Sequence, residues 1–162
     1  MDEQRKTEFE ALLHQHRGIV FKVANTYCWQ AEDRAELAQE IALQLWRAWP
    51  GFDRARVFTT WMYRIALNVA ISFVRKEAMR RGRSIPFDET LHDTPSLNME
   101  EPDARELRLH RFIECQPPLD RALLLLYLDD RPQREIAEIL GLTPTNVSTK
   151  INRLKQRIRT EL

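Results

Sequence analysis

The feature that most constrains this chain is the run from Arg134 to Val147, which combines the end of one helix with the start of another. The apolar residues before the turn have the spacing of one buried helix face: Ile136, Ala137, Ile139 and Leu140. Gly141 is the residue type that ends a helix in the left-handed region, and Thr143–Pro144 supplies an N-cap followed by a first-turn proline. The run therefore predicts a helix-turn-helix.

The helix after the turn indicates what this motif binds. Its apolar stripe consists of Val147, Ile151, Leu154 and Ile158. Its basic residues are Lys150, Arg153, Lys155, Arg157 and Arg159, with Glu161 as the nearby acid, and its short polar residues are Thr145, Asn146, Ser148, Thr149 and Asn152. A DNA major groove accommodates such a helix, because cations meet phosphates while short polar groups reach base edges. We therefore predict DNA binding, with a merely solvated charged helix as the alternative.

Charge and proline divide the chain into two parts. The formal net charge of +1 hides a basic block at residues 74–83 and an acidic block at 84–106. Three prolines (Pro86, Pro95 and Pro102) interrupt the polar stretch between residues 82 and 102, which predicts a flexible linker. We expect an all-α chain with two small helical domains, at residues 1–81 and 103–162, joined by this acidic linker at 82–102.

Apolar spacing predicts the helices of each domain. The first domain should contain a helical stretch over 9–27, broken near Gly18, and a helix with a core stripe of Leu37, Ile41 and Leu45 that ends at Pro50–Gly51. A third helix should run from Thr59 or Thr60 to about Met79 and bury Trp61, Ile65, Leu67 or Val69, and Ile71. The second domain should begin with helices at 103–115 and 119–128.

The same residues weigh against several other classes of protein. The two cysteines, Cys28 and Cys115, are far apart and form neither a disulfide framework nor a CxxC motif, which indicates a reducing, cytoplasmic location. No apolar stretch approaches the length of a membrane-spanning helix, so we expect no membrane insertion. Four histidines (His14, His16, His92 and His110) have no cysteine at ligand spacing, so no metal site is expected. No nucleophile–base arrangement suggests an enzyme, and we predict neither catalysis nor a cofactor.

Several stretches of the sequence give the chain a family resemblance. Residues 36–46, Phe52–Asp53 and residues 58–70 resemble conserved region two of small bacterial sigma factors of the extracytoplasmic-function type, and residues 119–162 resemble their region four. The resemblance implies a sigma region 2 bundle followed by a sigma region 4 helix-turn-helix. It also implies that the chain binds core RNA polymerase and directs promoter-specific transcription initiation. The free chain is expected to be a monomer, with an anti-sigma factor as a possible further partner.

The resemblance assigns roles to residues of the first domain. Gln39 and Glu40 match the pair with which family members grip the polymerase, and both lie opposite the predicted core stripe; the implied polymerase-binding set is Glu36, Gln39, Glu40 and Gln44. The family captures an unpaired base of the minus-ten element between the second and third helical stretches, and flipped bases are held by stacking and edge hydrogen bonds. The implied minus-ten set is Phe58, Thr60, Trp61, Arg64, Asn68, Arg75 and Lys76. Core packing is the alternative role for Trp61.

In the second domain the resemblance implies contacts to the minus-thirty-five element. The implied set is Thr145, Ser148, Thr149, Lys150, Asn152, Arg153, Lys155 and Arg157. Arg153 is the strongest candidate for a base contact, because a guanidinium pairs bidentately with guanine. Several positions depart from the family pattern, namely the loop 54–57, Leu67, Ser72, Pro132 and Ser148. These departures leave the promoter preference open.

Two competing functions and two questions about individual segments remain open at this point. A stand-alone transcriptional regulator fits the second domain equally well but gives the Gln39 and Asn68 neighbourhoods no role. A helical enzyme acting on nucleic acid would need a carboxylate metal cluster. The acidic linker suits the positively charged channel of a polymerase, or is only a soluble connection. The Leu123–Leu126 run is either core or part of a surface for an anti-sigma factor.

Overall fold

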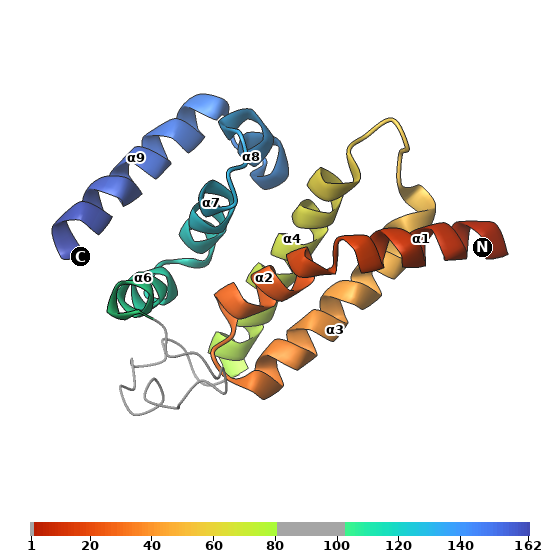
Figure 1. The fold of residues 1–162 in the computed structure, drawn as a ribbon, viewed down its shortest axis with the longest axis horizontal. Coiled ribbons are helices and arrows are strands. Elements are labelled where there is room, and N and C mark those ends of the chain that lie inside the picture. The colour runs from red at the N-terminus through yellow and green to blue at the C-terminus, as the bar shows by residue number, and fades with distance from the viewer. Residues whose placement is uncertain (1, 81–102) are drawn as a thin grey trace.

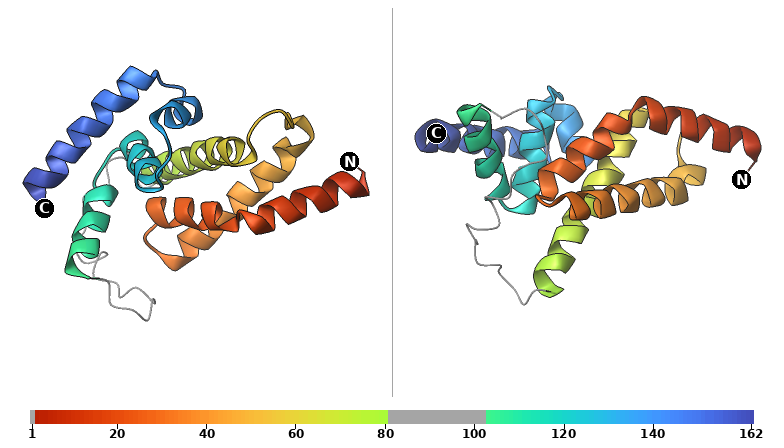
Figure 2. Two further views of the ribbon diagram at one scale, coloured as in Figure 1. Left: turned by 45° about the horizontal axis from the view of Figure 1, so that its top comes forward. Right: turned by 60° about the horizontal axis from the view of Figure 1, so that its bottom comes forward.

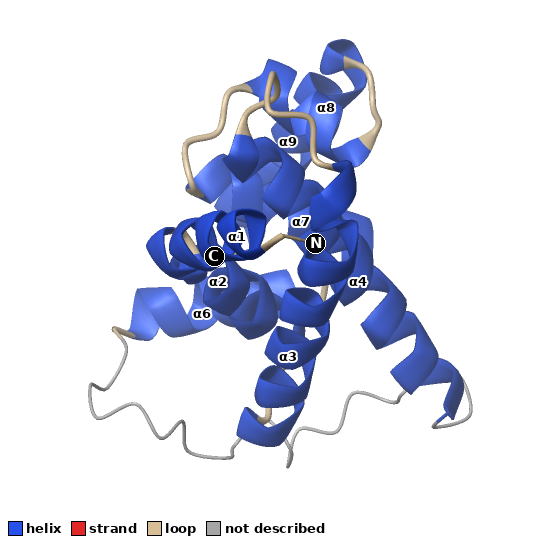
Figure 3. Ribbon diagram, turned by 90° about the vertical axis from the view of Figure 1, so that its right-hand side faces the viewer, coloured by secondary structure: helices blue, strands red, loops and turns tan. Residues whose placement is uncertain are grey.

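The computed structural model describes residues 2–80 and 103–162, and every regular element in these ranges is a helix (Figure 1, Figure 3). This confirms the all-α class, whereas the predicted linker at 82–102 lies outside the described residues. The N-terminal unit consists of α1 (Glu3–Gln15), α2 (Arg17–Tyr27), α3 (Ala31–Ala48), the short 3-10 helix η1 (Trp49–Gly51) and α4 (Phe58–Arg80). The C-terminal unit consists of α6 (Ala104–Glu114), α7 (Pro118–Leu128), α8 (Gln133–Leu140) and α9 (Pro144–Glu161). None of the described helices is both long enough and apolar enough to span a membrane.

Two predictions for the N-terminal unit can be compared directly with the structure. The α3 stripe of Leu37, Ile41 and Leu45 is fully buried, as predicted, because residues at these spacings share one helix face. The break that was predicted near Gly18 occurs at His16, which ends α1 and precedes α2.

The predicted core face of α4 was wrong. The buried residues are Met62, Tyr63, Ala66, Leu67 and Ala70, whereas Trp61, Ile65, Val69 and Ile71 are only partly buried. The fully buried face also includes two small residues, Ala66 and Ala70, and α4 contacts helices of both units, α2 and α3 on one hand and α7 and α8 on the other. Of the expected residues, only Leu67 belongs to the fully buried face.

The helix-turn-helix forms as the sequence predicts. Gly141 ends α8 with a φ of +70°, and the Leu142 amide donates to the Ala137 carbonyl across the turn. The Thr143 hydroxyl then caps α9 by accepting from the Asn146 amide at 3.1 Å. The apolar stripe of α9 is buried at Val147, Ile151 and Leu154, with Ile158 partly buried.

The two units pack directly against each other. Helix α7 contacts α2 and α4, α8 contacts α4, and α6 contacts α2. In α7, Leu123, Leu124 and Leu126 are buried, so core packing accounts for most of the leucine run. Helix α9 packs on α7 and α8, and Figure 2 shows it on the side of the molecule away from the N-terminal helices. We call the contact between α6–α8 and the helices α2 and α4 the interdomain seam.

Two glycine substitutions test the turn between α8 and α9. Gly141→Ala should lower the free energy of unfolding by roughly 1 kcal/mol, because an L side chain is strained in the left-handed region. Gly18→Ala is the matched control, because Gly18 lies within α2 and has open space around it, so alanine there should be neutral or stabilising. Urea unfolding of both variants measures the difference. Equal effects at the two positions would contradict the assigned turn geometry.

Candidate nucleic-acid interface

The N-terminal half of α9 presents the predicted minus-thirty-five residues to solvent. Thr145, Thr149, Asn152 and Arg153 are exposed, and Ser148 and Lys150 are partly exposed. The Thr149 hydroxyl donates to the Thr145 carbonyl at 3.0 Å, which fixes its rotamer on the helix surface. Because α9 turns its apolar stripe to α7 and α8, this polar and basic face is free to enter a DNA groove.

Two basic residues further along α9 also hold the C-terminal unit together. Lys155 Nζ lies 4.7 Å from the centre of the Tyr127 ring. The Arg157 guanidinium donates to Gln116 Oε1 at 2.8 Å and lies 5.3 Å from the centre of the Phe112 ring. Gln116 is buried, and its backbone carbonyl accepts from Arg121 at 2.9 Å. Sequence reasoning missed this role of Gln116, because its partner Arg157 is distant in the chain.

A cleft of about 350 Å³ lies at the start of α4, where the minus-ten residues were predicted. Thr60, Trp61 and Arg64 line one wall. The loop before α4 supplies Ala55, Arg56 and Val57, and α8 supplies Glu138. The structure therefore brings together three of the predicted minus-ten residues and adds a loop arginine that the prediction did not single out.

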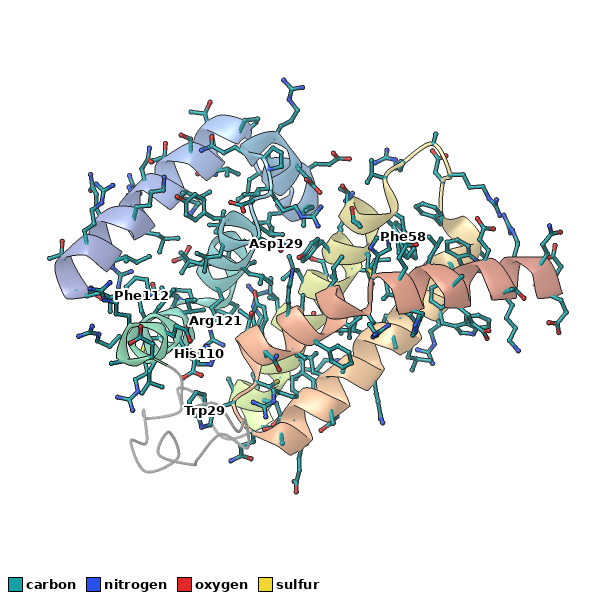
Figure 4. All side chains as sticks on the ribbon, in the orientation of Figure 1. Trp29, Phe58, His110, Phe112, Arg121 and Asp129 are labelled. Atoms are coloured by element: carbon teal, nitrogen blue, oxygen red, sulfur yellow. The ribbon has the colours of Figure 1, made fainter. Side chains whose placement is uncertain are left out.

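Aromatic rings pack behind this cleft. The Trp61 ring centre lies 4.9 Å from that of Phe52 and 5.5 Å from that of Phe58, whose place near the start of α4 is labelled in Figure 4. Trp49 stacks on Phe52 with ring centres 5.3 Å apart. These contacts support the packing role that was the alternative for Trp61, although the same residue also lines the cleft.

A second groove, of about 770 Å³, runs between α3 and α4. Its α3 side carries three predicted polymerase-binding residues, Glu36, Glu40 and Gln44, and Gln44 donates to Glu40 at 2.9 Å. The fourth, Gln39, is exposed but does not line the groove. On the α4 side lie Asn68 and Lys76, so the structure separates both from the minus-ten cleft, and Arg75 is exposed outside both hollows.

Asp129 is the centre of the interdomain seam (Figure 4). It accepts from Lys22 Nζ at 2.6 Å, from the Tyr63 hydroxyl at 2.7 Å and from Arg131 Nε at 3.0 Å. Partial burial alone would raise the pKa of this carboxyl, but the three donors outweigh burial and hold the pKa below its ordinary value of 3.8. Burial and the bond to Asp129 raise the pKa of the Tyr63 hydroxyl, which therefore stays protonated as a donor.

The other end of the seam is held by Tyr27. Its hydroxyl donates to the Pro118 carbonyl at 2.7 Å, and the Arg121 guanidinium lies 5.7 Å from the centre of its ring. The ring centres of Trp29 and His110 lie 5.5 Å apart across the same contact. Among the described residues no group of three or more His, Cys, Asp and Glu side chains is arranged to hold a metal ion.

Comparison with known proteins identifies both units. Residues 12–80 match the family described as Sigma-70 region 2, and residues 106–158 match Sigma-70, region 4. The chain belongs to the sigma factors of the extracytoplasmic-function type. The stand-alone regulator considered above does not account for the region 2 match.

Relatives of this sigma factor cover nearly its whole length at low identity. It is 23% identical to the ECF RNA polymerase sigma factor SigW of Bacillus subtilis, covering 95% of this chain and 88% of that relative. It is 24% identical to the ECF RNA polymerase sigma factor SigE of Mycolicibacterium smegmatis, covering 98% of this chain but 63% of that relative's length.

Solved structures share the fold. The sigma factor RpoE of Bartonella quintana, in complex with the anti-sigma factor NepR, matches with a TM-score of 0.73 at 14% identity, covering 94% of this chain and 95% of that one. CnrH in complex with the cytosolic domain of CnrY matches with a TM-score of 0.68 at 20% identity, covering 96% of this chain and 87% of that one.

The seam should weaken in acid through Asp129. A carboxyl group whose pKa is lowered by folding stabilises the fold fully above its ordinary pKa of 3.8, and the contribution is lost as the pH falls through the lowered value. Asp129→Asn should therefore cost about 2 kcal/mol of unfolding free energy at neutral pH, the size of hydrogen bonds to a charged group. The cost should shrink as the pH falls below 3.8.

Urea unfolding of the wild type and Asp129→Asn over a series of pH values measures this difference. Glu10→Gln, at an exposed position on α1, is the control and should have little effect at any pH. A cost of Asp129→Asn that is independent of pH would show that the charged carboxylate is not its cause.

Proposed function

We propose that this sigma factor divides promoter recognition between its two units. The N-terminal unit docks on core RNA polymerase through the α3 surface that carries Glu36, Gln39, Glu40 and Gln44. The cleft at the start of α4 takes an unpaired base of the minus-ten element, and the exposed half of α9 reads the minus-thirty-five element as duplex. One observation carries this proposal: the residues that match region 2 form most of a cleft, and the residues that match region 4 include an exposed basic helix in the same chain.

The cleft has the chemistry that base capture requires. Trp61 supplies an aromatic wall, Thr60 a hydroxyl, and Arg56 and Arg64 two cations for the phosphates of the strand. Such a site favours single-stranded over duplex DNA, because a base inside a duplex stack cannot reach an aromatic wall. Asn68 and Lys76 lie in the groove between α3 and α4. In this proposal they contact either the polymerase or the melted strand beyond the cleft.

The exposed half of α9 has the chemistry for duplex readout. Arg153 is placed for a bidentate contact to guanine, with Asn152 and Thr149 beside it on the same exposed half. Lys150 lies within reach of the phosphates on either side. Lys155 and Arg157 meet phosphates only at the far end of the helix, where they also contact α6 and α7.

Within this proposal the chain itself performs no catalysis and acts in the cytoplasm, where polymerase works. Bond formation belongs to the core enzyme, and the sigma factor supplies binding energy and strand separation. An anti-sigma protein that covers the polymerase-facing surface of α3 is a proposed further partner.

Reconstituted transcription tests the proposal. Core polymerase with the wild-type chain should give specific run-off transcripts from promoters selected out of a random library. Arg153→Ala should reduce them roughly fivefold or more, since one bidentate base contact contributes about 1–3 kcal/mol of discrimination. The control Arg159→Ala, at an exposed basic position near the end of α9, should change them much less. Specific initiation with core polymerase alone, or no initiation with the wild-type chain at any promoter, would refute the assignment.

A further inference from the structure

Helix α8 contacts the polar groups of the minus-ten cleft. The Thr60 hydroxyl donates to Glu135 Oε1 at 3.0 Å, and Arg56 lies 3.6 Å from Glu138 Oε1. Glu138 is itself part of the cleft lining. Two carboxylates of the C-terminal unit therefore engage a hydroxyl and a cation of the N-terminal unit at the site assigned to an unpaired base.

These carboxylates present the same kind of group as a DNA strand. Phosphate and base-edge oxygens accept from hydroxyls and guanidinium groups, and carboxylate oxygens do the same. A strand that used Thr60 and Arg56 would have to displace Glu135 and Glu138, and it would meet their negative charge as it approached. The contact is therefore competitive with single-stranded DNA by chemistry as well as by position.

The position of α8 is fixed by the seam. Arg131, between α7 and α8, donates to both Asp129 and Glu135, and its guanidinium lies 5.0 Å from the centre of the Tyr63 ring. Asp130, with a φ of 57°, makes the turn that brings Asp129 and Arg131 together. The seam thus carries α8 to the cleft, while α9 stays exposed on the other side of the same unit.

The individual contacts at the cleft are weak enough to be displaced. The Arg56 and Glu138 side chains are 62% and 55% exposed, and exposed ion pairs contribute little because water screens them. The hydrogen bond from the Thr60 hydroxyl and the bonds of the interdomain seam supply the remaining stabilisation of the contact between α8 and α4. Such a contact competes with a DNA strand for the polar groups of the cleft in the free chain, and it is lost when the two units separate.

We propose that the docking of α8 on the start of α4 is an autoinhibitory contact, in which Glu135 and Glu138 engage Thr60 and Arg56 at the minus-ten cleft in place of single-stranded DNA. The free chain then binds single strands poorly until the two units part. This inference rests on the proposed function of the cleft. It concerns the free chain, so it is tested apart from transcription.

The test measures the affinity of the free chain for a fluorescent, random-sequence single-stranded DNA pool and for a duplex pool of the same length. Glu135→Gln/Glu138→Gln removes the two carboxylates. The control Glu10→Gln/Glu106→Gln makes the same change of net charge at exposed positions on α1 and α6. Tyr63→Phe loosens the seam without changing any charge, because it removes only the hydroxyl that donates to Asp129.

The expected result is a gain in single-strand affinity of at least about fivefold for the double variant over its control, with a smaller gain for Tyr63→Phe. Duplex affinity should match the control, because α9 is exposed in both states. Thermal unfolding by circular dichroism verifies that each variant is folded.

Single-strand affinities of the double variant equal to those of its control would overturn the autoinhibitory contact, as would a gain of equal size on duplex DNA. Failure of the wild-type chain to initiate with core polymerase would overturn the proposed function instead. The two failures are therefore distinguishable.

Discussion

The bond network around Asp129 determines how the rest of this molecule is arranged. One partly buried carboxylate accepts from a lysine of α2, a tyrosine of α4 and the arginine that follows α7. Hydrogen bonds to a charged, partly buried acceptor are among the stronger polar interactions in proteins, and these three come from parts of the chain far apart in sequence. The network therefore fixes the end of α7 against two helices of the N-terminal unit.

That fixed point places the two helices of the helix-turn-helix in opposite surroundings. Helix α8 follows directly from Arg131 and faces the start of α4, whereas α9 leaves the Gly141 turn and packs on the outer side of α7. The same motif thus offers an exposed basic surface on α9 and, on the preceding helix α8, a pair of carboxylates that contact the other unit. In the functions proposed here, recognition of duplex DNA and competition with single-stranded DNA belong to different helices of one motif.

The sequence predicted what depends on neighbours along the chain. The α3 stripe, the Gly141 and Thr143 caps and the buried face of α9 follow from local spacing and turn chemistry, and the structure bears them out. The family resemblance located both units, and the comparisons support it. The individual site residues stay predictions, now with known positions.

The sequence could not predict what depends on contacts between the units. The predicted core face of α4 was wrong because that helix contacts helices of both units, and its buried face includes the small residues Ala66 and Ala70. Nothing local distinguishes Asp129 or Glu138 from ordinary solvated acids, since Lys22 and Tyr63, which bond to Asp129, and Arg56, which pairs with Glu138, lie far away in the chain. Asn68 was grouped with the cleft by resemblance, but helix geometry places it in the α3–α4 groove.

Zero-length cross-linking of the free chain tests the seam most directly. A water-soluble carbodiimide joins an amine and a carboxylate in direct contact as an amide, with loss of water, and Lys22 Nζ lies 2.6 Å from Asp129 Oδ1. The account predicts that digestion and mass spectrometry of the monomer will find the Lys22–Asp129 cross-link, and that Lys22→Arg will abolish it. Coupling of Lys22 only to other carboxylates, with Asp129 unmodified, would contradict the docked arrangement of the two units.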